Sequence, residues 1–406
     1  MRIALVSNHA SPMVVLGGVD AGGQNVHVAA LSKALSARGA EVTVYTRRQD
    51  PGVPRRVPFR NGVTVEHVAA GPTHPISKDD QFPFMEQFAA QLERAWTRWR
   101  PDVVHANFWL SGYASVLGAT PIGAPVVQTF HALGVVKRRH QGEMDTSPPE
   151  RFPVERWLVA NVDHVIATCT DEVFELRRLG GDIERVSIVP CGVNLRLFRP
   201  DGRVVARRDG WHRLVVVSRL VPRKGIDDVI RALATLPRTE LLVAGGPRRE
   251  HLDRDPEIAR LRDVAADAGV RDRVVFLGRL ERHDVPPLMR SADAVVSTPW
   301  YEPFGIVPVE AMACGVPVVA TAVGGMIDTI RDGVTGLHVP PKDHEAIADA
   351  VRELLNDPGR RHTMGQAGVV RARMHYSWDR IAEATLGAYR AVADRDRRLA
   401  EEVSHG

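Results

Sequence analysis

The chain has 406 residues, of which 44% are hydrophobic and 25% charged, which is the composition of a folded globular protein and excludes a disordered or fibrous chain. The length predicts about two to three domains. The net charge of +4 permits an acidic partner but does not require one.

Several classes of protein are excluded by what the sequence lacks. No apolar run approaches the roughly 20 residues that span a bilayer, and residues 1–7 lack the pattern of a signal peptide. The three cysteines, Cys169, Cys191 and Cys314, are too scattered for a disulfide framework or a zinc site. We therefore expect a cytoplasmic protein without a metal, a membrane-inserted segment or a nucleic-acid partner, and an oligomer is neither predicted nor excluded.

The first half of the chain alternates short apolar runs with helical patterns. Strands are predicted at Ile3–Ser7, Glu41–Thr46, Thr64–Val68, Pro101–Ala106, Pro125–Thr129, His164–Thr168 and Val186–Val189. Helices are predicted at Asn25–Arg38, Phe84–Trp99 and Asp171–Leu179. Such an alternation is typical of a parallel sheet covered by helices.

The alternation breaks at Leu197–Trp211, whose Arg, Pro and Gly suit a linker, and a second series follows. Its strands are predicted at Arg213–Val217, Glu240–Ala244, Val274–Leu277, Ala294–Thr298, Pro317–Ala320 and Gly336–Val339. Its helices are predicted at Ile226–Leu236, Glu257–Ala268, Val285–Ser291, Pro308–Ala313, His344–Asn356 and Trp378–Ala393. The sequence thus predicts an α/β protein of two doubly wound domains, with ligands at the carboxyl ends of the strands in a cleft between them.

A glycine-rich run, GGVDAGGQN over residues 17–25, directly follows the first strand and opens a helix. Glycines let the backbone approach a ligand closely, and the free N–H groups of a helix start favour an anion. The run lacks the GxGxxG spacing of a dinucleotide fold. A flexible glycine turn is the alternative interpretation.

A basic run, SRLVPRKG over residues 218–225, follows the first strand of the second half. It places Arg219 and Lys224 between a strand end and a helix start, where phosphate binds in many proteins. The guanidinium would act as a fork and the ammonium as a point charge. A solvated basic loop is the alternative.

The most specific run is YEPFGIVPVEAMACG, residues 301–315. Glu302 falls on a loop and Glu310 on the helix that follows, with the amides of Phe304 and Gly305 at the start of that helix. Carboxylates and backbone N–H groups in this layout can bind sugar hydroxyls together. Two surface carboxylates on an ordinary helix are the alternative.

Together these runs resemble the glycosyltransferases of family 4, which have the GT-B architecture of two Rossmann-like domains facing across a cleft. The resemblance covers essentially the whole chain, and DAGGQNVHV, HANFWLSGY and TFHALGVVK are similar to runs of sucrose synthases, sucrose-phosphate synthases and the inositol-phosphate N-acetylglucosaminyltransferase of mycothiol synthesis. It implies an N-terminal acceptor-binding domain over residues 1–195 and a C-terminal nucleotide-sugar-binding domain over residues 196–377. A terminal helix over residues 378–406 would cross back to the N-terminal domain.

The resemblance also implies how the donor is bound. Arg219 and Lys224 would hold the diphosphate, Glu310 the ribose hydroxyls and Glu302 the hexose. Arg279 would pack on the base. The full donor-binding set is Gly22, Gly23, Arg219, Lys224, Arg279, Leu280, Glu302, Phe304, Gly305, Ile306 and Glu310.

The reaction implied is the retaining, metal-independent transfer of a hexosyl unit from a nucleotide diphosphate sugar, with a UDP-sugar favoured and no cofactor. The residues expected to carry it are His131, Arg219, Lys224 and Glu302. Electrostatic stabilisation of the leaving diphosphate would be the main catalytic effect. Its oxygen would take the acceptor's proton, so no protein nucleophile is expected.

The acceptor is expected to be small and polar, phosphorylated or not. Asn25 and Lys78 match positions with which the inositol-phosphate enzymes bind an acceptor phosphate, and Arg151 is a further candidate. Phe108 stands where those enzymes have a tyrosine, and Ala132 where they have a threonine. Each missing hydrogen bond to a charged group is worth about 1.5–3 kcal/mol, which speaks against inositol phosphate.

Other interpretations stay open. The chain could be the inositol-phosphate N-acetylglucosaminyltransferase itself, a GT-B-shaped sugar-nucleotide epimerase, or a non-catalytic partner that keeps the nucleotide site. The cluster from Lys137 to His140 could bind an acidic acceptor or form a solvated surface. The amphipathic segment Phe82–Trp99 holds two glutamates beside few basic residues, so we interpret it as a core-packing helix rather than a membrane-binding one.

Overall fold

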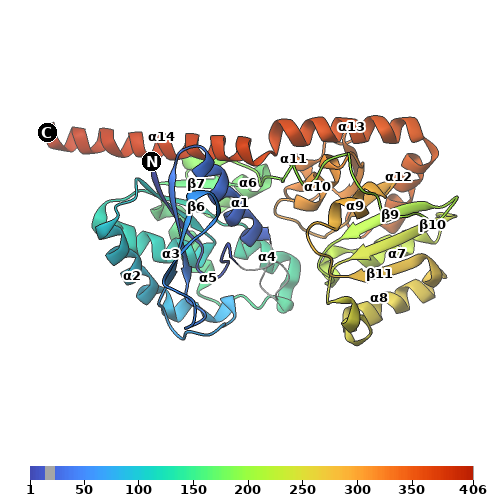
Figure 1. The fold of residues 1–406 in the computed structure, drawn as a ribbon, viewed down its shortest axis with the longest axis horizontal. Coiled ribbons are helices and arrows are strands. Elements are labelled where there is room, and N and C mark those ends of the chain that lie inside the picture. The colour runs from blue at the N-terminus through green and yellow to red at the C-terminus, as the bar shows by residue number, and fades with distance from the viewer. Residues whose placement is uncertain (14–22, 406) are drawn as a thin grey trace. The chain divides into compact units, whose positions relative to one another are not determined.

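A computed structural model of the chain describes residues 1–13 and 23–405 (Figure 1). The chain divides into two compact units. Unit 1 comprises Met1–Cys191 and the C-terminal segment from Trp378, and unit 2 comprises Gly192–Ser377. The chain therefore passes from unit 1 to unit 2 and returns.

Unit 1 is built on a sheet with the strand order β3-β4-β2-β1-β5-β6-β7-β8 in the described residues, parallel throughout except that β3 runs antiparallel to β4. Its strands are β1 (Arg2–Val6), β2 (Glu41–Arg47), β3 (Arg56–Pro58), β4 (Thr64–Val68), β5 (Val103–Asn107), β6 (Val126–Thr129), β7 (His164–Ala167) and β8 (Val186–Ile188). Its helices are α1 (Gly23–Ala37), α2 (Met85–Arg98), α3 (Trp109–Ala119), α4 (Gly134–Gln141), α5 (Arg151–Asn161), α6 (Thr170–Arg178) and α14 (Trp378–His405).

Helices cover both faces of this sheet, because successive strand residues point to opposite sides. On β2, Val44 belongs to a core shared with α1 and α14, whereas the ring of Tyr45 meets Trp96 of α2 on the other side, at 5.8 Å between centroids. Figure 1 shows α14 running along unit 1, where it packs on α1 and β7. The strand order reverses between β1 and β5, and ligands bind at the carboxyl ends of strands at such a point.

Unit 2 contains a wholly parallel sheet with the order β11-β10-β9-β12-β13-β14. Its strands are β9 (His212–Val217), β10 (Thr239–Ala244), β11 (Val274–Gly278), β12 (Ala294–Ser297), β13 (Val318–Thr321) and β14 (Gly336–Val339). Its helices are α7 (Ile226–Leu233), α8 (Pro256–Asp267), α9 (Val285–Arg290), α10 (Ile306–Ala313), α11 (Met326–Thr329), α12 (His344–Asn356) and α13 (Pro358–His375). Here the order reverses between β9 and β12.

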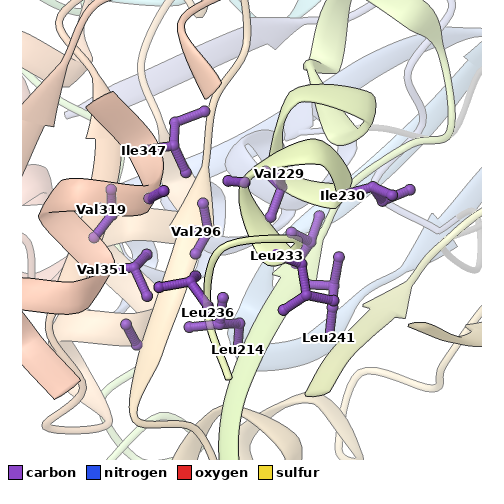
Figure 2. Close-up of a cluster of buried hydrophobic side chains, with 14 of the residues drawn as sticks. Leu214, Val229, Ile230, Leu233, Leu236, Leu241, Val296, Val319, Ile347 and Val351 are labelled. Carbon is purple, nitrogen blue, oxygen red and sulfur yellow. The ribbon is translucent and has the colours of Figure 1, made fainter. Parts of the chain in front are cut away.

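One core of unit 2 lies between its sheet and the helices α7 and α12 (Figure 2). Val229 and Leu233 of α7 and Ile347 and Val351 of α12 are spaced four residues apart, so each pair lies on one helix face. All four side chains are fully buried against strand residues such as Val296. Burial of each such side chain contributes about 1.5–3 kcal/mol, and this core fixes the strand ends that carry the site.

The structure also contains helices that the hydrophobic pattern did not predict, namely α3, α4, α5, α11 and α13. Residues on every side of α3 are buried, so its sequence has no polar face to reveal a helical period. In α13 the glycines are required by packing, because a Cβ on Gly365 would lie 2.2 Å from the carbonyl oxygen of Gly315. In the described part of the chain, no helix has both the length and the apolar character needed to cross a membrane.

Candidate functional site

The basic loop of unit 2 and the loop before Glu302 are tied together at the carboxyl ends of β9 and β12. The loop after β9 turns through the short 3-10 helix η7 (Pro222–Lys224) into Gly225, which has φ +64°. Thr298 donates its hydroxyl to the Gly225 carbonyl at 3.0 Å, and the Trp300 amide donates to the Arg223 carbonyl at 2.9 Å. A Cβ on Gly225 would lie 2.2 Å from the Thr298 carbonyl oxygen, so only glycine fits this approach.

This arrangement brings Lys224 and Glu302 into an ion pair. Burial alone would raise the pKa of Glu302, but the charge and hydrogen bond of Lys224, with the charges of Arg223 and Arg219, outweigh it and hold that pKa below its usual value. Arg219 itself is exposed. Three cations thus surround one ionised carboxylate, a surplus of positive charge that favours an anionic ligand.

The loop from Glu302 to Gly305 is held from behind by the turn at Gly324 and Gly325. The Gly325 amide donates to the Glu302 carbonyl at 3.0 Å, and the Thr329 hydroxyl donates to the Phe304 carbonyl at 2.9 Å. A Cβ on either glycine would meet this loop's backbone at about 2.3–2.4 Å. The loop conformation therefore depends on both glycines.

Gly305 has φ +85° and directly precedes α10, so the amides of Gly305 and Ile306 lie at the start of that helix. The ring of Phe304 is buried and packs edge-on against Tyr376. The backbone thus supplies helix-start N–H groups near Glu302, at Gly305 and Ile306 where the sequence predicted Phe304 and Gly305. Such groups bind oxygen-rich and anionic ligands.

Glu310, one turn into α10, is almost fully buried and forms an ion pair with Arg282. Burial raises the pKa of this carboxyl group, and Arg282 offsets only part of the rise. Its second oxygen, Oε2, finds no hydrogen-bond partner among the described residues. Arg282 is itself placed over the ring of Phe198, 4.6 Å from the ring centroid. A buried carboxylate oxygen with no protein partner is a candidate ligand contact, because burying it unpaired is costly.

Arg279 and Leu280 follow β11, where Gly278 has φ +72° and packs against the backbone of residues 247–249. The Arg279 amide donates to the Pro247 carbonyl at 2.8 Å, and both side chains are half-buried. The backbone at Arg279 is therefore fixed at a strand end. The role in packing on a base stays a prediction.

In unit 1, His131 lies at the carboxyl end of β6 with the unusual φ of +62°. Its Nε2 is 2.9 Å from Asn107 Oδ1, and the amide nitrogen of Asn107 donates to the carbonyls of Val6 and His105. The oxygen of that amide must then accept, so His131 Nε2 carries the proton and Nδ1 the lone pair. Burial, with the neighbouring His27, His105 and His9, lowers the pKa of His131 well below its usual value, so the ring is neutral at pH 7.

The candidate acceptor residues Phe108, Arg151 and Lys78 gather near His9. Phe108 is buried, and its ring lies 4.8 Å from the His9 ring and 5.0 Å from the Arg151 guanidinium carbon. The charges of Lys78 and Arg151 both act on His9. Asn25 is buried and donates to the Ser11 carbonyl at 3.0 Å.

At the glycine-rich run, Gly23 is the first residue of α1 and is exposed, whereas Gly22 lies outside the described residues. The next residue, Gln24, donates from its amide to the Ser7 hydroxyl at 3.1 Å and to the Asn107 carbonyl at 3.3 Å. The start of α1 is thereby fixed beside the ends of β1 and β5. An anion-binding role of the glycines stays a prediction.

The cluster from Lys137 to His140 lies on α4, and its three cations contact carboxylates. Lys137 Nζ lies 2.8 Å and Arg138 Nε 3.8 Å from Asp145, and Arg139 donates two parallel hydrogen bonds to Glu175. The cluster is therefore a set of ion pairs. This agrees better with a structural surface than with a free basic patch.

Four residues around these positions had not been singled out from the sequence. Arg223 and Arg282 are two arginines in a chain that has few lysines, so neither stood out. His9 follows β1, whereas Asp79 lies in the short 3-10 helix η2 (Lys78–Asp80), and only folding brings the charge of Asp79 close to His9. Among the described residues, no three His, Cys, Asp or Glu side chains gather as metal ligands.

Comparison with known proteins identifies relatives of both halves of the chain. A family model described as Glycosyl transferases group 1 matches residues 203–371, and one described as Glycosyl transferase 4-like domain matches residues 22–192. The chain is similar to D-inositol 3-phosphate glycosyltransferase of Acidothermus cellulolyticus, with 36% identity over 99% of this chain and 94% of the relative. It is 37% identical to the protein of the same name from Mycobacterium tuberculosis, over 99% and 87% of the two chains.

Solved structures with the same architecture are also found. Sucrose-phosphate synthase from Thermosynechococcus elongatus superposes with a TM-score of 0.86 at 33% identity, over 96% of this chain and 98% of that one. The Anabaena protein HepE, solved in complex with UDP, superposes with a TM-score of 0.73 over the full length of both chains. HepE is 20% identical, so it supports the fold alone.

Proposed function

This chain belongs to the glycosyltransferases of family 4 and has the GT-B fold, and we propose that it transfers a hexosyl unit from a UDP-sugar to a small polar acceptor with retention of configuration. Family and fold are those predicted from the sequence. The observation that carries the proposal is a pair of glutamates in unit 2, of which Glu302 is half-buried and Glu310 almost fully buried. Lys224 binds one of them, and the other, Glu310, keeps an oxygen without a protein partner.

The proposed donor site uses each of these groups for one part of a nucleotide sugar. Lys224, Arg223 and Arg219 supply the positive charge that a diphosphate requires. Glu310 Oε2 accepts from the ribose hydroxyls, and Glu302 with the amides at the start of α10 holds the hexose. Arg279 lies against the base. A uridine nucleotide is proposed because the resemblance to family 4 favours a UDP-sugar, and HepE, which shares the fold, was solved with UDP and with UDP-glucose.

The chemical step proposed is metal-independent breakage of the sugar–phosphate bond with positive charge developing on the sugar. Lys224 and Arg219 stabilise the leaving diphosphate, which is often the largest catalytic effect. His131 remains neutral and offers hydrogen bonds at the hexose without donating a net proton. The acceptor hydroxyl attacks on the face of the leaving group and passes its proton to the departing phosphate oxygen, so the chain supplies no nucleophile.

A second candidate is D-inositol 3-phosphate as the acceptor, because relatives that are 36–37% identical over nearly the whole chain carry that name. The acceptor site of unit 1 has Phe108 and Ala132 in places where a hydroxyl would help to bind phosphate. We therefore keep the proposal at a small polar acceptor.

Thermal shift against UDP, GDP, ADP and dTDP tests the donor site, because a ligand that binds only the native state stabilises it. We expect a selective rise in melting temperature with UDP. The absence of a shift with every nucleotide at millimolar concentration would contradict the proposal. Release of an isomerised sugar nucleotide without an acceptor would favour an epimerase instead.

Lys224→Ala should lower kcat by about 10²–10³-fold while the far-ultraviolet circular dichroism stays unchanged, because the variant loses one stabilising charge on the leaving group. Lys33→Ala is the control: this lysine lies over the ring of Phe59 in unit 1, at 4.8 Å. Near-normal turnover of Lys224→Ala would exclude the diphosphate role.

A further inference from the structure

The candidate acceptor cations of unit 1, Lys78 and Arg151, are each paired with a carboxylate, and so is Lys137, whose charge acts on Asp79. Lys78 Nζ lies 2.9 Å from both oxygens of Asp79. Lys137 Nζ lies 2.8 Å from Asp145, and Arg151 Nε lies 2.7 Å from Glu155. The positive charge of each of these three cations is therefore already offset by a neighbouring carboxylate.

These carboxylates are not free to move away. The side chains of Asp145 and Glu155 are each 1% exposed, and Asp79 also accepts a hydrogen bond from Thr146 at 2.9 Å. A phosphate beside Lys78 would lie next to the half-buried carboxylate of Asp79, and two anions so close repel each other.

Arg151 has its nitrogens engaged inside the protein. Nε donates to Glu155, Nη1 to the Ser147 hydroxyl at 3.2 Å, and Nη2 to the Ala132 carbonyl at 2.5 Å. The side chain is 2% exposed. Arg151 thus holds the segment after β6 in place and presents no open guanidinium fork to a ligand.

His9 offers the opposite kind of group, a neutral hydrogen-bond acceptor. Burial, reinforced by Lys78 and Arg151 against the opposing charge of Asp79, lowers the pKa of His9 to about 3. The side-chain amide of Asn8 donates its nitrogen to Gln81 and receives the Ser111 hydroxyl on its oxygen. His9 Nδ1, 3.3 Å from that oxygen, must therefore carry the proton, which leaves the lone pair on Nε2.

We propose that the acceptor is an uncharged polyol, a sugar or cyclitol without phosphate, whose hydroxyl donates to His9 Nε2 while Asp79 excludes phosphorylated analogues. This inference rests on the proposed function and specifies its acceptor. The site combines neutral imidazole acceptors with charge-balanced pairs, a chemistry that suits hydroxyl groups better than a dianion.

Matched acceptors test the charge preference. With UDP-glucose as the donor, UDP release and product mass are measured for myo-inositol against inositol 3-phosphate, and for fructose against fructose 6-phosphate. We expect kcat/KM to be at least about tenfold higher for the uncharged member of a pair. A preference for the phosphorylated member would overturn the inference and leave the proposed function standing.

A titration with inorganic phosphate tests whether Asp79 excludes phosphate, even when no acceptor of the panel reacts. The UDP complex of the wild type is expected to bind phosphate with a Kd above about 10 mM, and that of Asp79→Asn at least about tenfold more tightly. The matched control is Asp80→Asn, which removes the same charge from an exposed position of the same short helix, η2 (Lys78–Asp80). Tight phosphate binding by the wild type, or equal gains in both variants, would contradict exclusion by Asp79.

His9→Phe tests the hydroxyl contact while a ring is kept against Phe108. We expect KM for the polyol to rise about tenfold or more, with the affinity for UDP unchanged as evidence that the fold is intact. An unchanged KM would remove His9 from the acceptor site. If the wild type itself did not bind UDP, the result would instead contradict the proposed donor site.

Discussion

At the scale of single residues, Glu310 shows how one buried carboxylate depends on one arginine. Burial raises its pKa, and Arg282 is the cation that opposes this rise. The neighbouring Cys314 does not titrate in the accessible range, because burial raises the pKa of its thiol to about 12. The charge at this position of α10 therefore depends on Glu310 and Arg282.

We predict that Arg282→Met makes UDP affinity depend on pH. Without the guanidinium the pKa of Glu310 rises further, so the carboxylate that accepts from the ribose is increasingly protonated at pH 7 and recovers as the pH rises. Calorimetry should show UDP binding about tenfold weaker at pH 7 than at pH 9, with little change for the wild type. This range lies above the second ionisation of a phosphate, at about pH 6.

The control for this experiment is Glu310→Gln, which cannot ionise. Its UDP affinity should be low at both values of pH. If Arg282→Met bound UDP equally well at pH 7 and pH 9, Arg282 would have no part in keeping Glu310 ionised. Full affinity in Glu310→Gln would remove the ribose contact itself.

At the scale of elements, the loops that carry the site in unit 2 are held by close backbone approaches at glycines as well as by side chains. Gly225 lies between Lys224 and α7 and touches the carbonyl of Thr298, shortly before Glu302. Gly269, after α8, has a similar φ of +68° but open space where a Cβ would be. A side chain at Gly269 would therefore cause only the strain of a left-handed backbone. A side chain at Gly225 would cause the same strain and a steric conflict as well.

We predict that Gly269→Ala lowers the free energy of unfolding by about 1 kcal/mol, the cost of a left-handed backbone with a side chain. Gly225→Ala should cost at least about 2 kcal/mol more, because Cβ and the Thr298 carbonyl must separate, and it should also weaken UDP binding. Urea unfolding and calorimetry measure both effects. Equal losses of stability in the two variants would show that the backbone at Thr298 moves away from the new Cβ at no cost.

The individual strands and helices also show how far the sequence predicts the fold. The strands Thr64–Val68 and Gly336–Val339 and the helix His344–Asn356 have the predicted bounds. In the helix, Ile347, Val351 and Leu354 form one apolar face, which makes its period easy to recognise. The helices α3 and α13 were not predicted, since one is buried on every side and the other needs glycines for packing. The segment around Glu302 could be identified because its chemistry is contiguous in sequence, whereas the Arg282–Glu310 pair joins residues from separate elements.

At the scale of the whole molecule, the two units differ in how their buried titratable groups respond to acid. In unit 1, burial lowers the pKa of His27 to about 4 and that of His105 to about 3. Burial raises the pKa of Glu310 and Asp228 in unit 2, and also that of Glu155 and Glu172 in unit 1, so these carboxyl groups take up protons readily in the native state. The described histidines whose pKa is lowered by burial all lie in unit 1. Acid should therefore destabilise unit 1 more than unit 2.

The direction in which stability changes with pH follows from the number of protons that the native and the unfolded chain bind. Between about pH 4 and 6.5 an unfolded chain protonates His27 and His105, whereas the native chain does not. The stability that these residues give unit 1 is complete above about pH 7 and is lost as the pH falls through this window, at about 1 kcal/mol per pH unit for each histidine. Glu310 and Asp228 have the opposite effect, because a raised carboxyl pKa favours the native state as the pH falls.

We predict that unit 1 unfolds before unit 2 at pH 5, and that the gap between them narrows at pH 7.5. Differential scanning calorimetry gives the transitions, and hydrogen exchange assigns each to its unit. His27→Phe, which keeps a ring against Trp378 and His131, should reduce the pH slope of unit 1 by about 1 kcal/mol per pH unit. The exposed His362→Phe in α13 should leave both transitions unchanged, and an unaltered slope in His27→Phe would mean that His27 is protonated in the native state.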